Sequence, residues 1–183
     1  MSKASFIAVA FAIALAFPLP AQSPAAFEQP LLITSAGQSA DAQLAAVLAK
    51  KAELKADLVK MAGPKDLAGH KTLVLVLGAS MKGLGAAGLD TAKEKDRIKG
   101  LLAAAKTQGI PVLCLHLGGE ARRGELTDAM VAEYLPSARA ALVVKSGDKD
   151  GLFTRICKEK GIALTEVDRT LDAVEPLKTA FAK

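Results

Sequence analysis

Apolar positions along the chain fall into two alternating patterns. Short continuous apolar runs, such as Thr72–Leu77 (TLVLVL), are typical of strands buried on both faces of a sheet. Between these runs, apolar residues recur every three or four positions, as in helices with one buried face. The runs that we predict to be strands cover residues 31–37, 58–62, 72–77, 110–115, 141–145 and 162–167. Helices are expected to follow caps at Ser39 and Asp90, to span 152–160, and to occupy the segments before residue 135 and at the end of the chain.

Strict alternation of strands and helices makes a parallel sheet with helices on both faces. We therefore predict an α/β protein with a flavodoxin-like or Rossmann-like three-layer fold. Its mainly parallel sheet should contain five or six strands. Residues 27–183 are numerous enough to form a single domain with its own core.

The first 26 residues have the pattern of a signal peptide. Lys3 supplies a positive start, residues 6–17 (FIAVAFAIALAF) are apolar, and small residues and prolines fill positions 18–26. The apolar run is interrupted at Pro18, short of the roughly 20 residues that a membrane-spanning helix needs. We expect a leader over residues 1–26, with an approximate end, and a periplasmic or secreted product that is free of the membrane after cleavage.

The charge balance does not indicate a nucleic-acid partner. The formal net charge is +5, but the basic residues are spread along the chain, which has one tyrosine and no tryptophan. Basic patches interleaved with aromatic residues are absent from the sequence, so we expect no nucleic-acid binding.

Four unusual loops follow predicted strands: SAGQS (35–39), GASMKGLGAAG (78–88), HLGGEARRG (116–124) and SGDKDG (146–151). In open parallel sheets, ligands bind at the carboxyl ends of the strands, where the strand order reverses. We therefore expect these loops to converge on one edge of the sheet. The turns at residues 63–64 and at Gly109 should lie on the opposite edge.

The first two loops suggest an anion site. At a strand-to-helix turn, Gly37, Gln38 and Ser39 would present N–H groups and hydroxyls, which attract anions, although an ordinary helix cap explains the same residues. The second loop contains G-x-G-x-x-G from Gly83. It starts six residues beyond the strand, and no acidic residue ends the next strand, so we reject a dinucleotide site. Lys82 would supply charge instead.

The third loop combines a possible acid–base pair with two guanidinium groups. His116 and Glu120 could act as acid and base or bind a metal, and Arg122 and Arg123 could hold a carboxylate or phosphate. The alternatives are a histidine that closes the strand end and an arginine paired with Glu120. With one histidine in these loops, metal-ligand spacing lacks specificity, so no metal and no cofactor are expected.

Two resemblances add to this interpretation. The pieces LLITSAGQSAD, LVLGASMKGLGAAGLD, HLGGEARRGELTD and KSGDKDGLF resemble a bacterial family of exported proteins known as a domain of unknown function. The fold is also similar to flavodoxin-like domains, in which residues at the position of Gly37-Gln38-Ser39 hold a flavin phosphate. Aromatic residues that would flank a flavin ring are missing from these loops, so the similarity implies an anion pocket rather than a flavin.

From these patterns we expect an exported binding module for a small anionic ligand, a carboxylate or a phosphate. The expected ligand-binding residues are Ser35, Gly37, Gln38, Ser39, Ser80, Lys82, Gly83, Arg122, Arg123 and Asp148. One alternative is an enzyme that uses His116 and Glu120. A second alternative is a protein-interaction domain of an envelope complex, which an exposed apolar patch would indicate.

Overall fold

A computed structural model describes residues 27–181, so the leader expected at residues 1–26 lies outside the described residues. The strands form one sheet in which all neighbours run parallel, in the order β2-β1-β3-β4-β5-β6. They are β1 (Leu31–Ala36), β2 (Ala56–Leu58), β3 (Thr72–Leu77), β4 (Val112–His116), β5 (Ala140–Val144) and β6 (Ala163–Val167). The predicted α/β class with a parallel sheet of five or six strands is confirmed.

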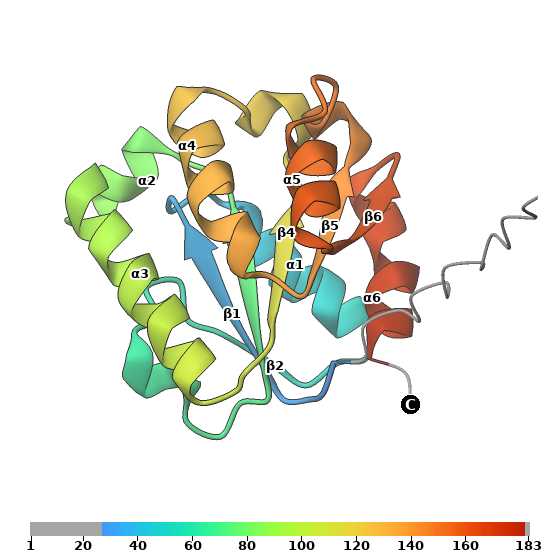
Figure 1. Ribbon diagram of the computed structural model, residues 1–183. Coiled ribbons are helices and arrows are strands. Elements are labelled where there is room, and N and C mark those ends of the chain that lie inside the picture. The colour runs from blue at the N-terminus through green and yellow to red at the C-terminus, as the bar shows by residue number, and fades with distance from the viewer. Residues whose placement is uncertain (1–26, 182–183) are drawn as a thin grey trace, which may run out of the picture.

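Helices cover both faces of the sheet, which completes the three layers (Figure 1). One face carries α3 (Thr91–Thr107), α4 (Glu125–Tyr134) and α5 (Leu152–Lys160), and the other carries α1 (Asp41–Lys51) and α6 (Val174–Ala180). Alternate strand residues enter the two layers: Leu32 packs with α3, whereas Leu31 and Ile33 pack with α1. Both faces of β1, β3 and β4 are therefore buried, which explains their continuous apolar runs, whereas the edge strands β2 and β6 are partly exposed.

Short helical turns connect several of these elements. One α-helix, α2 (Met81–Ala86), lies within the glycine-rich segment that we expected to be a loop. Its start is capped by Ser80, whose Oγ accepts a hydrogen bond from Gly83 N at 3.1 Å. The 3-10 turns are η1 (Pro64–Leu67), η2 (Gly119–Arg122), η3 (Leu135–Ser137), η4 (Lys145–Gly147) and η5 (Thr170–Ala173). None of the helices between residues 27 and 181 is long and apolar enough to cross a membrane.

The second strand is shorter and earlier than predicted. Regular pairing with β1 ends at Leu58, and residues 59–62 continue beside β1 through irregular bonds, among them Val59 N to Ile33 O at 3.0 Å. Here the Thr34 hydroxyl replaces part of the ladder by donating to Lys60 O and accepting from Ala62 N. Because β2 is parallel to β1, the turn at residues 63–64 leaves at the carboxyl edge, so placing it on the opposite edge was wrong.

The order of the strands reverses direction at β1. The chain moves from β1 outward to β2, then crosses to β3 on the other side of β1 and continues through β4, β5 and β6. The carboxyl ends of β1 and β3 are therefore the switch point, where an open α/β sheet leaves room for a ligand between diverging connections.

Candidate functional site

The loops after β1 and β3 are joined directly at the carboxyl edge. Ser80 N donates to Gly37 O at 2.8 Å, and Gln38 forms an isolated bridge with Ala79. Gly37 has a φ of 102°, and a Cβ atom there would lie 2.6 Å from Ala79 Cα. Only glycine fits this close approach. The two loops thus form a single connected wall.

A cleft of about 540 Å³ opens between these loops and the segment after β2. Its lining consists of Gln38, Ser39, Ala40, Lys60, Met61, Ser80, Lys82, Gly83, Ala86, Ala87 and Arg122. Among the residues proposed from sequence, Gln38, Ser39, Ser80, Lys82, Gly83 and Arg122 are thus brought together. Ser35, Gly37, Arg123 and Asp148 do not line this cleft.

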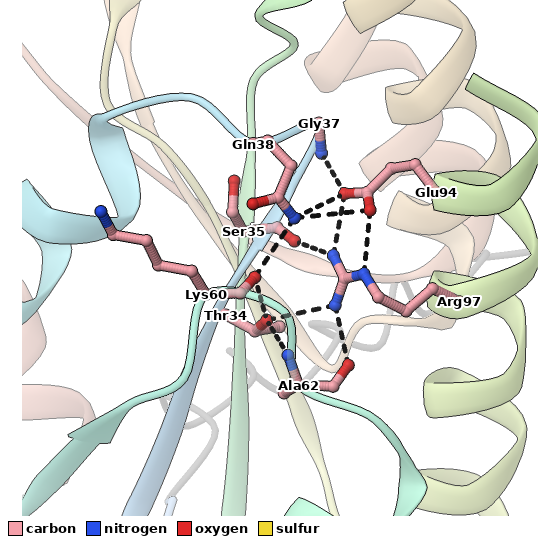
Figure 2. A network of polar contacts seen from close by, with 8 residues as sticks. All are labelled: Thr34, Ser35, Gly37, Gln38, Lys60, Ala62, Glu94 and Arg97. Carbon is pink, nitrogen blue, oxygen red and sulfur yellow. Dashed lines mark hydrogen bonds and ion pairs between the residues drawn. The ribbon is translucent and has the colours of Figure 1, made fainter. Parts of the chain in front are cut away.

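The expected anion donors of the first loop are engaged by an internal carboxylate. Glu94 of α3 is fully buried, and its Oε1 accepts from Gly37 N at 2.8 Å and from Gln38 Nε2 at 3.2 Å (Figure 2). Gln38 has a left-handed φ of 59° that aims its side chain at this carboxylate. The Gly37 N–H and the Gln38 amide group are therefore occupied from beneath the turn rather than directed at a ligand.

Arg97 completes this buried network. Its side chain is 12% exposed and forms an ion pair with Glu94 at 2.8 Å. The guanidinium also donates to the carbonyls of Ser35 and Ala62, and so ties α3 to β1 and to the segment after β2 (Figure 2). A buried charge is tolerated only when it is paired and hydrogen-bonded, which this arrangement achieves. The network fixes the floor beneath the turn at residues 37–39.

The serines of the first loop occupy different depths. Ser35 is fully buried in β1, and its Oγ has no hydrogen-bond partner among the described residues. Ser39 lines the cleft although it is only 3% exposed, and its Oγ accepts from Asp41 N at 3.3 Å. Helix α1 begins at Asp41 and not at a Ser39 cap, because Ala40 occupies the cap position without a side-chain bond.

The adjacent arginines of the third loop have different roles. Arg122 lines the cleft with its side chain 35% exposed, and its Nε lies 3.4 Å from the Asp41 carboxylate. Its terminal nitrogens donate no hydrogen bond to any of the described residues. Arg123 is instead a clamp: it donates to Asp128 Oδ1, to both Asp150 carboxylate oxygens and to Gly147 O. Arg123 therefore joins the third and fourth loops and does not face the cleft.

The Arg123 clamp should make stability depend on acid pH. Hydrogen bonds from Arg123 hold the pKa values of Asp128 and Asp150 below their usual range. A lowered folded-state pKa adds stability above the unfolded value of about 4, and this stability is lost as pH falls through the folded pKa. We expect an Arg123→Met variant to show a shallower loss of stability below about pH 4.

Urea unfolding from pH 6 to pH 2 measures this effect. Arg155→Met, which removes an exposed arginine from α5, should keep the acid dependence of the parent protein. Parallel pH profiles for the parent protein and Arg123→Met would contradict the role of the clamp.

His116 closes the end of β4 and is fully buried. Its Nδ1 lies 3.0 Å from Leu77 O and its Nε2 lies 3.0 Å from Gly119 O. Phe153 packs against the ring at a centroid distance of 4.9 Å. Both nitrogens thus face backbone carbonyls. His116 has no hydrogen bond to Glu120 or to a loop serine, which is the arrangement that would have favoured acid–base catalysis.

The acidic candidates also have structural partners. Glu120 is exposed and forms an ion pair with Lys149 at 2.5 Å. Asp148 caps α5: its Oδ1 accepts from Phe153 N at 2.7 Å and its Oδ2 from Thr154 N at 2.9 Å. No group of three or more His, Cys, Asp or Glu residues within 27–181 is arranged to hold a metal ion.

Five lining residues were not proposed from the sequence. Three are alanines in or next to the predicted loops (Ala40, Ala86 and Ala87), and the other two are Lys60 and Met61. Lys60 and Met61 follow β2, whose assignment to 58–62 placed them inside a strand. A parallel β2 that ends at Leu58 implies a fifth loop, with Lys60 and Met61, at the same edge of the sheet. A larger hollow of about 760 Å³ lies between α3 and α4 at the opposite edge, where Lys99 is already paired with Glu133. We favour the smaller cleft because it occupies the switch point.

The chain is similar to a known protein family over almost all of the described residues. A family model described as "Domain of unknown function (DUF6305)" matches residues 28–181. The chain belongs to this family. The DUF6305 match includes every strand of the sheet and all the residues that line the cleft. The resemblance to a family of unknown function that we drew from the loop motifs is confirmed.

Outside the DUF6305 family, the chain has only a distant similarity to the solved structures given below. No relative was found among curated protein sequences. Among solved structures, a serine-to-alanine mutant of the esterase AlinE4 is 14% identical, with 89% of this chain and 86% of that chain covered and a TM-score of 0.31. AlinE4 itself, described as an SGNH-hydrolase family esterase, is 14% identical over 84% and 81% of the two chains, also with a TM-score of 0.31. Similarity at this level carries no information about the activity of the DUF6305 chain.

Proposed function

We propose that this protein is an exported binding module that holds a small anionic ligand in the cleft at the carboxyl edge of the sheet. The observation that carries the proposal is the charge of the cleft lining. Lys60, Lys82 and Arg122 line it, and no acidic residue is among the described residues that do so. Three cations around one concave site attract and retain anions.

The basic groups of the cleft are available to a ligand. The Nζ atoms of Lys60 and Lys82 have no ion-pair partner among the described residues, and Figure 2 shows the Lys60 side chain extending away from the buried network. Arg122 uses Nε towards Asp41, which leaves the two terminal nitrogens of the guanidinium fork for a carboxylate or phosphate. Asp41 thus orients Arg122 from outside the lining.

Hydroxyl groups and helix geometry add to this attraction. Ser39 and Ser80 line the same cleft, and Ser39 stands two residues before the start of α1. The amino-terminal end of an α-helix carries partial positive charge, which favours an anion nearby. These features support an anion over a neutral or cationic ligand.

Export and binding are supported by different parts of the chain. The apolar segment at residues 6–17 and the small residues after it support a signal peptide, and hence a periplasmic or secreted location. The positions of His116 and Glu120 favour binding over acid–base catalysis, because one is enclosed by carbonyl groups and the other is exposed.

Arg122 provides the test. Inorganic phosphate, sulfate or butanoate at millimolar concentration should raise the melting temperature of the protein by mass action. In Arg122→Met, which keeps the aliphatic stem, we expect affinity to fall about tenfold, because a charge-assisted hydrogen bond is lost. Calorimetric titration measures the change.

The matched control is Arg155→Met, which removes an exposed arginine outside the cleft and should bind as the parent protein does. If no anion in this panel shifts the melting temperature, the proposal fails. If Arg122→Met binds as tightly as the parent protein, the ligand lies elsewhere.

A further inference from the structure

The size of the cleft exceeds what an inorganic anion needs. Pockets for small organic molecules are about 300–1,000 Å³, and this cleft of about 540 Å³ falls within that range. A single tetrahedral oxyanion would fill only a small part of it. The remaining volume must be filled by water or by the body of an organic ligand.

The wall formed by α2 changes character along its length. Lys82 and Gly83 line the cleft at the first turn of the helix, and Ala86 and Ala87 line it one turn later. Residues four apart lie on the same helix face and are separated by about 6 Å along the axis. The wall therefore runs from a charged end to an apolar end.

Met61 extends the apolar part of the site. It lines the cleft and is 49% exposed, and it is one of only four large apolar residues that are exposed between residues 27 and 181. Methionine is flexible and adapts to irregular apolar partners. No aromatic side chain is among the described residues of the lining, so the site has no flat surface on which a sugar or a nucleobase would stack.

The sheet order separates the ends of the cleft. Arg122 follows β4, whereas Met61 follows β2, and β3 and β1 lie between these strands. We infer that the ligand is an aliphatic carboxylate, and this inference rests on the proposed anion site. Its carboxylate binds Arg122 and Lys82, and its hydrocarbon body extends along α2 between Ala86, Ala87 and Met61.

A series of straight-chain monocarboxylates tests this inference. Calorimetric titration with propanoate, butanoate, hexanoate and octanoate should show affinity increasing about two- to fourfold for each methylene group that the cleft partly or fully buries. Inorganic phosphate should bind more weakly than hexanoate. Met61→Ala should reduce the gain per methylene while leaving the affinity for propanoate unchanged.

Leu171→Ala is the matched control, because Leu171 is also an exposed apolar residue, at 61%, but lies outside the cleft. It should leave the whole series unchanged, which separates cleft binding from nonspecific binding of longer chains. A flat series, or phosphate as tight as octanoate, would overturn the inference while leaving the anion proposal intact. Pentanedioate tighter than pentanoate would also overturn it, with Lys60 then holding a second carboxylate. If no anion binds, both proposals fall together.

Discussion

Replacing Glu94 with alanine should lower the free energy of unfolding by about 3–5 kcal/mol, because it leaves a buried arginine without its counter-ion. Glu94 is fully buried and pairs with Arg97, which is only 12% exposed. The same substitution removes the acceptor for Gly37 N and for Gln38 Nε2. Removing one partner of a buried pair costs far more than a surface pair contributes. Chemical denaturation of the purified protein measures the loss.

Two further variants make this prediction specific. Glu133→Ala removes a glutamate that pairs with Lys95 and Lys99 at the surface, and it should cost less than about 1 kcal/mol. The double variant Glu94→Leu with Arg97→Leu should lose less than the sum of the single losses, because it leaves no unpaired buried charge. Additive losses, or equal effects of Glu94→Ala and Glu133→Ala, would show that the network does not act as a unit.

The Glu94 network should also influence ligand binding. It holds Gln38 in a left-handed conformation at the cleft wall, and Lys60 is fixed through its backbone carbonyl, which accepts from Gln38 Nε2 and Thr34 Oγ1. In a Glu94→Gln variant that remains folded, we expect weaker anion binding with the Arg122 contact unchanged. The role of Glu94 is that of a positioning residue.

The Gly83→Ala substitution should destabilise the protein by about 3 kcal/mol, which is the upper end of the range for overpacking. This loss is expected although alanine is a better helix former than glycine. Gly83 lies within α2, and a Cβ atom there would stand 2.0 Å from Gln38 O. This oxygen belongs to the backbone of a turn that is held by Glu94 and by Ser80 N, so it cannot move aside cheaply. Helix α2 would have to shift, and anion affinity should fall as the cleft wall moves.

The same helix supplies the control. Gly85 is two residues further along α2, and a Cβ atom there would meet nothing within 4 Å. Gly85→Ala should therefore stabilise the protein by about 0.5–1 kcal/mol through helix propensity and reduced freedom of the unfolded chain. Opposite signs for Gly83→Ala and Gly85→Ala in thermal and urea unfolding are the expected result. A gain of stability in both variants would mean that α2 does not pack against the turn at residues 37–39.

The sequence by itself determined the architecture of this protein. Strands buried on both faces are apolar throughout, and helices with one buried face carry apolar residues every three or four positions. Both signals are local in the sequence. The runs at β1, β3 and β4 and the helix at Leu152–Lys160 were therefore predicted close to their observed bounds. The convergence of four loops followed from parallel topology, because all parallel strands end at one edge.

The weakest local signals produced the errors. The segment around Leu58 carries too few apolar residues to define its ends, so β2 was placed too late and the loop with Lys60 and Met61 was missed. In the glycine-rich segment, α2 has a single fully buried residue, Leu84, and glycines that are poor helix formers. Both β2 and α2 are held by contacts with β1 and the turn that follows it. These contacts leave no periodic pattern in the sequence.

Only the tertiary structure decided which candidate residues face the cleft. Arg122 and Arg123 are neighbours in sequence, yet one lines the cleft while Asp128 and Asp150 hold the other. The turn sequence predicts that the Gly37 N–H is free to bind a ligand, but the N–H donates to the carboxylate of Glu94, 57 positions later in the chain. The direction in which a side chain points depends on partners that the fold brings from distant elements, and a pattern read along one chain does not contain those partners.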